Sequence, residues 1–466
     1  MINKDFQDSI VNFADKFFLS LIFYNCYIFV YSLKSILSNT NVNSGFYFFC
    51  ICLALCLSFI SYKISRSKNI ERKINLFLLF FSIAFVVFSF EIFLELKKQK
   101  VGSKIQIAAE ENIKFDRRSK LEVLNYYNKE KIITLPNVLP SYFLETNGLS
   151  ILKDRIFPLG GISNQNVILD NELGYYPIIE TDEFGFNNIK GLYNKNTDVL
   201  LIGDSFAEGY SVNSNQTISA LLNKAGLNTL SLGKGNNGPL IEFATLREFI
   251  SHLKPKFVFW LYCINDMSNL KNELKSTLLK NYLFDDNYLQ NLFYEQDKIN
   301  PFLRDFAIER MEEIEMQEAY KEIQKDDQKR FLKIIRLENL RYILSLTTKK
   351  KVLLNDEQKL TFKKIMHKSN ELVKQHNGKL FFVYLSPYGR YHNRGAKHQN
   401  HDFIFKSIKN LNIPIIDTHS QVISNHEDPL SLFPFRQSGH YTPEGYKLIF
   451  EKIFSTINSE LKLLGN

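Results

Sequence analysis

The stretch VLLIGDSFAEG, residues 199–209, decides the fold of the larger part of this chain. Its first four residues are valine, leucine and isoleucine, which is typical of a buried strand in a parallel sheet. The strand then ends abruptly on Gly203, Asp204 and Ser205. Open α/β proteins place their chemistry at the carboxyl edge of such a sheet. Ser205 is therefore the candidate nucleophile.

Four further apolar runs predict the other strands of this sheet, because each is rich in β-branched or aromatic residues and is bounded by turn residues. With residues 198–202, the predicted strands are 227–232, 257–262, 380–385 and 413–416. Helical spacing of apolar residues predicts helices over about 217–225, 241–252, 357–376, 402–409 and 443–463. Strands that alternate with helices call for a parallel sheet covered on both faces. The predicted fold class is α/β with three layers.

Two further polar motifs follow Ser205 in the order that serine acyl chemistry needs. Asn265 and Asp266 follow the third strand, and SGHYTPEG, residues 438–445, precedes the last helix. These positions supply an amide donor and a terminal base, His440, which would take the serine proton. The alternative for His440 is a surface histidine at a helix N-terminus. The ordered motifs favour the functional interpretation.

This order of motifs resembles the SGNH (GDSL-type) hydrolase superfamily over about residues 195–460. The Gly-Asp-Ser block, a glycine-rich turn after the second strand, Asn-Asp after the third and the late histidine match its four-block pattern. The flanking stretches TDEFGFNN (181–188) and FPF (433–435) are similar to membrane-anchored bacterial members. The resemblance implies a flavodoxin-like, SGNH-hydrolase-like domain and acyl transfer to Ser205.

The resemblance also implies an oxyanion hole with three donors. They would be the backbone N–H of Ser205, a backbone N–H of the turn GKGNNG (233–238) and the side-chain amide of Asn265. The turn position that is glycine in most relatives is Asn236, or Gly235 with a shift of one residue. Asparagine keeps the amide donor and tolerates a positive φ better than other residues do.

One position departs from the pattern of the family. Relatives carry an aspartate two or three residues before the histidine, whereas this chain has Ser438 and Gln437. Ser438, Gln437 or a main-chain carbonyl is a candidate to orient His440 in a Ser-His dyad, and Asp428 and Glu427 are remote substitutes. Loss of the aspartate costs about 10⁴ in kcat in a serine protease. The departure keeps open a catalytically impaired module that binds the cell envelope.

The N-terminal hundred residues hold three windows almost free of charge, about 17–33, 46–62 and 74–90. Each is close to the ~20 residues that cross a bilayer, so we expect three retained spans. The connection 63–73 carries five basic residues, and the connection 34–45 carries Lys34 alone. The positive-inside rule then places residues 63–73 in the cytoplasm and exports the C-terminal domain. Lysines at 97–104 argue the other way, but the contrast between the two loops is larger.

We expect three parts along the chain. Residues 1–96 form a three-helix transmembrane anchor, residues 97–195 a stalk and irregular entry segment, and residues 196–466 the hydrolase-like domain. A helical insertion at about 269–356 is charged with aliphatic residues at helical spacing. It is interpreted as a solvated helical hairpin, with a cap over the site as the alternative.

Several classes of partner are not expected. Much of the net charge of +9 lies beside the spans, and no basic stripe with interleaved aromatic residues appears, so no nucleic acid is expected. Only Cys263 lies outside the spans, which excludes a disulfide within the exported domain. His392, His398, His401 and Asp402 match no zinc pattern, so neither a metal nor another cofactor is expected.

These observations predict a serine esterase, or an O-acyl transesterase that uses the same acyl-enzyme. It would lie in the bacterial inner membrane as a multi-pass protein, with its catalytic domain in the periplasm. Its partners would be the lipid bilayer and an acyl ester. Location and family analogy suggest an acylated envelope glycan as the ester. The alternative remains the impaired SGNH-fold module that binds the envelope.

Overall fold

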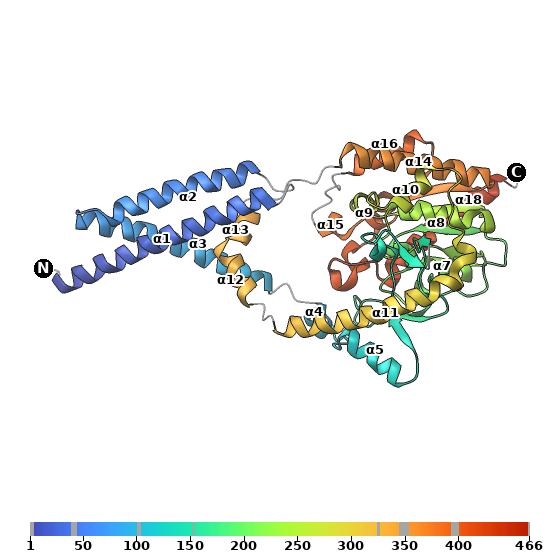
Figure 1. Cartoon of the computed structure of the whole chain (residues 1–466), viewed down its shortest axis with the longest axis horizontal. Helices are drawn as coiled ribbons and strands as arrows, with labels where there is room; N and C mark the ends of the chain where they lie inside the picture. The colour runs from blue at the N-terminus through green and yellow to red at the C-terminus, as the bar shows by residue number, and fades with distance from the viewer. Residues whose placement is uncertain are drawn as a thin grey trace. The chain divides into compact units, whose positions relative to one another are not determined.

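The computed structural model describes residues 4–38, 44–99, 104–151, 154–323, 327–343, 354–392 and 400–464. They divide into two compact units, which Figure 1 shows as ribbons. The first unit comprises Met1–Gly102 and Glu322–Leu353, and the second comprises Ser103–Lys321 and Leu354–Asn466. The chain therefore leaves the second unit once, contributes α12 (Asp327–Ile335) and α13 (Glu338–Ile343) to the first, and returns.

The second unit is built on a five-stranded parallel sheet of order β10-β9-β8-β6-β7. The strands are β6 (Val199–Gly203), β7 (Thr229–Ser231), β8 (Phe257–Tyr262), β9 (Lys379–Tyr384) and β10 (Ile415–Asp417). The first strand thus lies between the second and the third, which is the flavodoxin-like order. The strand order reverses between β6 and β8, and ligands bind at such a point. The predicted fold class is confirmed.

Both faces of the sheet are covered, and this explains why β6 and β8 are apolar throughout. Leu200 and Ile202 of β6 pack into one core, and Val199 and Leu201 pack into the other. The first face carries α8 (Pro239–Leu253), α14 (Asp356–Gln375) and α16 (His401–Asn410). The second face carries α7 (Ile218–Lys224) and α18 (Pro443–Leu464).

Residues 104–195 are part of the second unit and not a stalk. They form α4 (Lys104–Glu110), α5 (Lys120–Lys129), a three-stranded sheet β1-β4-β5 and a hairpin β2-β3. The strands are β1 (Thr134–Pro136), β2 (Leu149–Ile151), β3 (Asp154–Ile156), β4 (Asn166–Ile168) and β5 (Ile178–Glu180). Single apolar residues within this mostly polar sequence, such as Phe157 and Phe186, are buried in the same core as Leu200 and Ile202, the main core. The expected boundary at residue 195 is therefore wrong.

The predicted insertion at 269–356 is not one hairpin, because it divides between the two units. In the second unit, α9 (Asp266–Glu273), α10 (Thr277–Phe284) and α11 (Leu292–Ile323) contribute Leu270, Tyr282 and Leu303, respectively, to the main core. Phe293 of α11 packs there too, because its ring lies against that of Phe184, with centroids 4.8 Å apart. Residues 324–326 and 344–353 lie outside the described residues.

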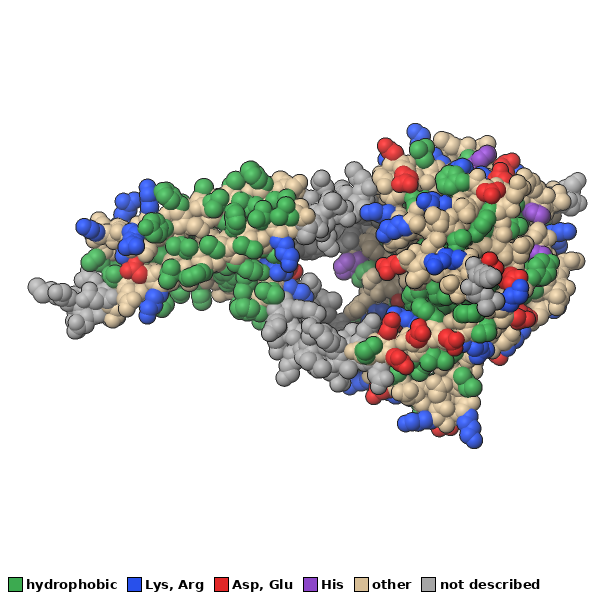
Figure 2. All heavy atoms as spheres, viewed as in Figure 1, with side chains coloured by type: hydrophobic (Ala, Val, Ile, Leu, Met, Phe, Trp, Pro, Cys, Tyr) green, Lys and Arg blue, Asp and Glu red, His purple; other side chains and the backbone are tan. Residues whose placement is uncertain are grey.

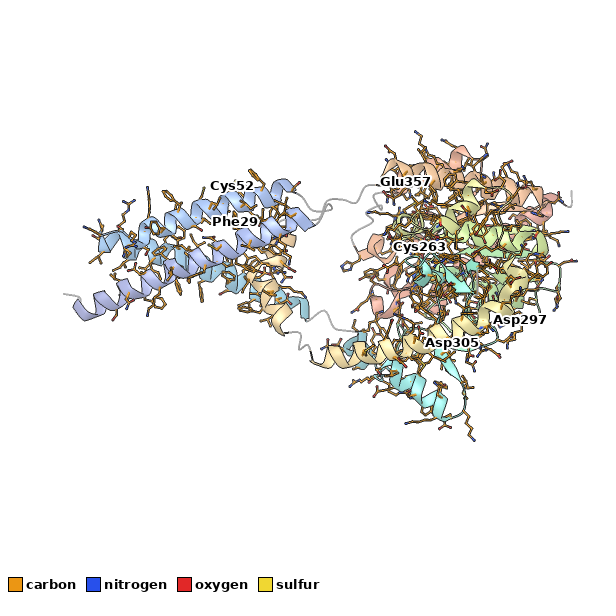
Figure 3. The ribbon with its side chains drawn as sticks, viewed as in Figure 1. Phe29, Cys52, Cys263, Asp297, Asp305 and Glu357 are labelled. Carbon is orange, nitrogen blue, oxygen red and sulfur yellow. The ribbon has the colours of Figure 1, made fainter. Side chains whose placement is uncertain are left out.

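The first unit contains α1 (Lys4–Ser38), α2 (Ser44–Ser65) and α3 (Ile70–Gln99). Among the described residues, these three helices are long and apolar enough to cross a membrane. Many of their outward side chains are large and hydrophobic, for example Phe23 and Phe48, and Figure 2 shows them spread over the helices. An apolar surface of this extent indicates association with lipid or protein. All five cysteines are free; Figure 3 labels Cys52 on α2 and Cys263 in the second unit.

Candidate active site

Ser205 lies where β6 turns into α6 (Ser205–Glu208), at the carboxyl edge of the sheet. Asp204 caps this short helix, because its carboxylate accepts the backbone N–H of Phe206 at 2.9 Å. The same carboxylate accepts the side-chain amide of Asn265 at 3.0 Å. Burial raises the pKa of Asp204. Asp204 therefore joins the motif after β6 to the motif after β8, which is a bracing role.

His440 contacts Ser205 directly. The distance from His440 Nε2 to Ser205 Oγ is 2.7 Å, within the reach needed for proton transfer. Two aromatic rings flank the imidazole, with centroids 4.7 Å away for Phe206 and 5.0 Å away for Tyr210. The ring is thus held by contact with two aromatic rings as well as by its hydrogen bonds.

The second nitrogen of His440 meets a carboxylate that sequence reasoning missed. Nδ1 lies 3.1 Å from Oε1 of Glu172, and Oε2 accepts the backbone N–H of His440 at 2.8 Å. A Cβ on Gly439 would lie 2.7 Å from Oε2, so glycine at 439 permits this approach. Burial alone would raise the pKa of Glu172, but its bonds to His440 outweigh burial and lower it to about 2. The group is an anion at neutral pH.

The expectation that Ser438 or Gln437 orients the ring is therefore wrong, because Glu172 occupies the Nδ1 position. Asp428 does not substitute either, since it forms an ion pair with Arg436. Glu172 precedes His440 by 268 residues, and only the tertiary fold brings the two together. One signal was present in the sequence. Residues 170–174, DNELG, form an acidic turn between two apolar runs, as a functional loop between strands would.

The turn that carries Glu172 is fixed on both sides. Asn171 accepts the backbone N–H of Gly174 at 2.8 Å and donates its amide to the carbonyl of Asp116 at 2.9 Å. Gly174 has φ +91°, a conformation that favours glycine. The carboxylate of Asp170 accepts the hydroxyl of Tyr210 at 2.7 Å. The same turn therefore positions both Glu172 and one of the rings that flank the imidazole.

The glycine-rich turn presents one candidate oxyanion donor and not two. The N–H of Gly235 donates to Glu208 Oε2 at 2.8 Å, so it is already engaged. Asn236 adopts φ +58°, the conformation expected for it. Among the described residues, no acceptor of its backbone N–H is found. Asn269 holds the turn by donating to the carbonyl oxygens of Asn236 and Asn237, at 3.2 and 3.1 Å.

A buried ion pair supports this turn from below. Lys234 Nζ lies 2.8 Å from Glu208 Oε1, and both side chains are fully buried. Asn137 contacts both partners, accepting from Lys234 at 2.7 Å and donating to Glu208 at 2.8 Å. A buried pair needs further hydrogen bonds to balance its desolvation. Here these bonds connect α6, the glycine-rich turn and residue 137 of the N-terminal segment.

Other acidic residues lie beneath the site. Asp266 accepts the backbone N–H of Cys263 at 2.9 Å, which fits the structural role expected for it. Burial raises the pKa of Glu273 to about 8, although its carboxylate accepts the N–H groups of Leu240 and Gly238. No group of side chains suited to a metal ion is found among the described residues. Of the expected histidine cluster, His401 stacks on Phe405, and His398 lies outside the described residues.

A cavity of about 480 Å³ lies beside His440, with Tyr210 lining the cavity and contacting the imidazole. Its lining combines tyrosine rings with charged and amide side chains and includes Lys120, Asn137, Tyr142, Asp170, Tyr176 and Arg310. Lys120 pairs with Asp170 at 2.7 Å, and Arg310 lies over the ring of Tyr142, 5.0 Å from its centroid. The cavity is therefore polar and aromatic, and its charged lining residues are two cations and one anion.

No family model matches this sequence, and no curated protein is similar to it in sequence. Solved structures are similar to part of the chain. A GDSL-like lipase from Bacteroides thetaiotaomicron is 13% identical, with 57% of this chain and 89% of that chain covered and a TM-score of 0.31. An alpha/beta hydrolase enzyme from the metagenome of Lake Arreo, Spain, is 13% identical, with 57% and 98% covered and a TM-score of 0.31.

The character of the second unit follows from its own geometry. Its strands have the flavodoxin-like order. The Gly-Asp-Ser turn, the Asn-Asp motif and the late histidine meet at the carboxyl edge of this sheet. The second unit therefore has an SGNH-hydrolase-like fold.

Proposed function

We propose that this protein is a membrane-anchored serine esterase or O-acyltransferase whose catalytic triad is Ser205, His440 and Glu172. One observation carries the proposal, namely the continuous contact from Ser205 Oγ to His440 Nε2 at 2.7 Å and from Nδ1 to Glu172 at 3.1 Å. This is the arrangement of nucleophile, base and orienting carboxylate that activates a serine.

In the proposed reaction, Ser205 Oγ attacks the acyl carbon while His440 takes its proton. Glu172 holds the imidazole in the required tautomer and stabilises the imidazolium that forms. The tetrahedral oxyanion is bound by the N–H groups of Ser205 and Asn236 and by the amide of Asn265. The alcohol then leaves with the proton from His440. Water, or a second hydroxyl in a transfer reaction, resolves the acyl-enzyme through the same base.

The contact with Glu172 favours this proposal over the impaired binding module. That alternative rested on the lack of a carboxylate near the histidine in sequence. Glu172 supplies a carboxylate in contact with Nδ1, and its low pKa, about 2, keeps it ionised. A site that had lost its reaction would not need a partly buried anion on the far side of the base.

We further propose an acylated glycan as the substrate. The cavity beside Tyr210 is within the size range of ligand sites. Its tyrosine rings offer flat apolar faces, on which the C–H groups of a sugar ring can pack. The amide and charged groups around them can bond sugar hydroxyls. A fatty acyl substrate would favour an apolar lining instead.

We place the protein in the bacterial inner membrane with the second unit in the periplasm. Support comes from the three apolar helices and from the basic residues of the connection 63–73. An envelope glycan would be accessible there. The serine chemistry itself does not depend on this orientation.

The proposal is tested with the purified full chain in detergent. We expect release of p-nitrophenol from a short acyl ester and labelling by a fluorophosphonate, both lost in Ser205→Ala. The matched control is Ser214→Ala, which removes an exposed hydroxyl of the same unit. Activity that survives in Ser205→Ala, or a wild-type protein that neither hydrolyses nor labels, contradicts the proposal.

A further inference from the structure

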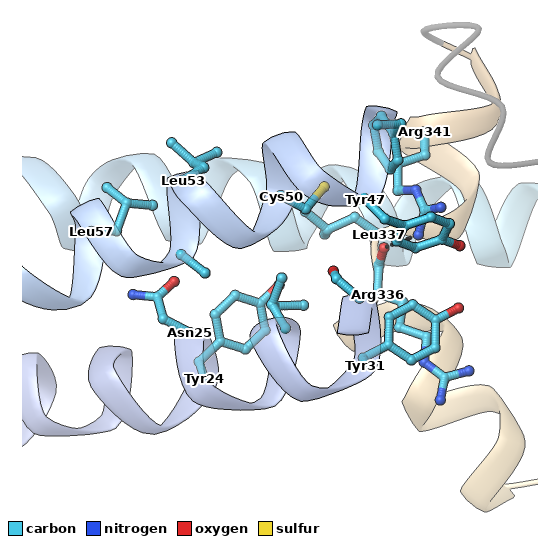
Figure 4. A pocket seen from close by; sticks show the side chains of 14 residues that line it. Tyr24, Asn25, Tyr31, Tyr47, Cys50, Leu53, Leu57, Arg336, Leu337 and Arg341 are labelled. Atoms are coloured by element: carbon cyan, nitrogen blue, oxygen red, sulfur yellow. Dashed lines mark hydrogen bonds between the residues drawn. The ribbon is translucent and has the colours of Figure 1, made fainter. Parts of the chain in front are cut away.

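The first unit contains a cavity of about 200 Å³ bounded by α1, α2 and the segment of α12 and α13. Figure 4 shows the side chains that line it, spread along α1 and α2. Leu53 and Leu57 of α2 line one end, and Arg336, Leu337 and Arg341 lie at the other. The arginine end is also the end at which Tyr31 and Tyr47 lie. The lining is therefore charged at the arginine end and mainly apolar at the leucine end, where Asn25 also lies.

The two arginines at this end differ in their partners. The Arg336 guanidinium lies over the ring of Tyr31, 4.4 Å from the centroid, donates from Nε to the Tyr27 hydroxyl at 2.9 Å, and forms a long ion pair with Glu338 at 3.9 Å. Arg341 lies over Phe46 at 5.3 Å. Its Nε is buried without a hydrogen-bond partner, and no ion pair of Arg341 is found within the described ranges.

Nearby carboxylates are used for another purpose. Glu91 accepts the backbone N–H groups of Asn339 and Leu340, at 2.9 and 2.8 Å. Glu95 accepts the side-chain amide of Asn339 at 2.8 Å. These bonds attach α13 to α3 and leave the positive charge of Arg341 unbalanced locally. A buried or half-buried guanidinium calls for an anion.

The residues that line the cavity indicate which kind of anion it would bind. A guanidinium matches a phosphate with two parallel hydrogen bonds. Here the basic end continues into a part of the cavity lined by leucine and alanine side chains. An acyl chain would be favourably placed there, because apolar surface is more stable in an apolar environment than in water. Tyrosine and arginine near the ends of apolar helices are typical of the membrane interface.

We propose that this cavity binds a phosphate-bearing membrane lipid, with its phosphate on Arg336 and Arg341 and an acyl chain along Leu53 and Leu57. The inference rests on the proposed insertion of α1, α2 and α3 in a membrane. It does not depend on the esterase reaction. It adds a binding site to the anchor, which otherwise only retains the protein at the bilayer.

The first test measures lipid retention by native mass spectrometry of the full chain in detergent. Phosphatidylglycerol should bind at least about tenfold more tightly than diacylglycerol with the same chains, because only the former offers a phosphate. Glycerol phosphate, which lacks the chains, should also bind at least tenfold more weakly. Equal binding of diacylglycerol, or of glycerol phosphate, overturns the proposal.

Variants assign the effect to the arginines. Arg336→Gln together with Arg341→Gln should weaken phosphatidylglycerol binding about tenfold or more. The matched control is Arg66→Gln, an exposed arginine just after α2 that does not line the cavity. Wild-type affinity in the double variant, or an equal loss in Arg66→Gln, contradicts the site.

A second measurement guards against a misfolded variant. Cys50 lines the cavity, whereas Cys52 on the same helix is exposed and does not. Phosphatidylglycerol should slow alkylation of Cys50 by N-ethylmaleimide severalfold in the wild type and leave Cys52 unchanged. In the double variant the protection of Cys50 should vanish while the rate at Cys52 stays the same. No protection of Cys50 in the wild type overturns the proposal, whether or not the protein hydrolyses esters.

Discussion

Replacing Glu172 by glutamine tests the part of the triad that the sequence motif lacks. Lowering the pKa of this group from 4.5 to about 2 corresponds to about 3 kcal/mol of preferential interaction with the anion, at 1.36 kcal/mol per unit. Most of this interaction is with His440 and should grow when the imidazole becomes charged. Glutamine cannot serve both contacts, because its NH₂ group would face either the N–H of His440 or Nδ1. We expect kcat to fall between about 10²-fold, from the lost charge, and 10⁴-fold, from the wrong tautomer.

The assay is the steady-state rate with a p-nitrophenyl ester, together with the rate of fluorophosphonate labelling. The matched control is Glu180→Gln on β5, an exposed carboxylate paired with Lys190 that lies away from the imidazole. Glu172→Gln should retain its fold, its KM should change little, and its labelling rate should fall with kcat. A folded Glu172→Gln protein that keeps more than about a third of the wild-type kcat refutes the reasoning.

Three other outcomes follow from the same structure. The stability that ionised Glu172 contributes should be complete above pH 4.5 and should disappear as the pH falls through about 2. In denaturant titrations, the difference in unfolding free energy between wild type and Glu172→Gln should therefore shrink between these pH values. Lys234→Met should lower the unfolding free energy by about 3–5 kcal/mol by leaving Glu208 buried and unpaired, and Lys234→Met with Glu208→Leu should recover part of this loss; equal stability of wild type and Lys234→Met would contradict the buried pair. Protease added to intact spheroplasts should degrade the second unit, whereas survival of that unit until the membrane is permeabilised would place it in the cytoplasm.

The sheet could be predicted because its signal is local. Each strand reads as an apolar run between turn residues, and helices on both faces make every position of β6 and β8 buried. Ser205 and His440 could also be found, since each follows or precedes a recognisable element in fixed order. The meeting of their side chains at 2.7 Å is then a consequence of strand order.

The rest of the site depends on contacts that no local pattern encodes. Glu172 lies in a segment expected to be irregular and acts across 268 residues. The sequence leaves Gly235 as a plausible oxyanion donor, but in the structure its backbone N–H donates to the carboxylate of Glu208. Residues 104–195 are mostly polar, and isolated buried residues such as Phe157 cannot be recognised among them. Single large side chains at irregular spacing leave no periodic signal.

The central claim is that Ser205 becomes acylated, and this is measured directly by mass spectrometry of the quenched protein after mixing with p-nitrophenyl acetate. We expect one acetyl group on the peptide that contains Ser205. It should accumulate at a rate that falls with Glu172→Gln and be absent in Ser205→Ala. An acetyl group on another residue, or turnover with Ser205 unmodified under single-turnover conditions, would contradict the account.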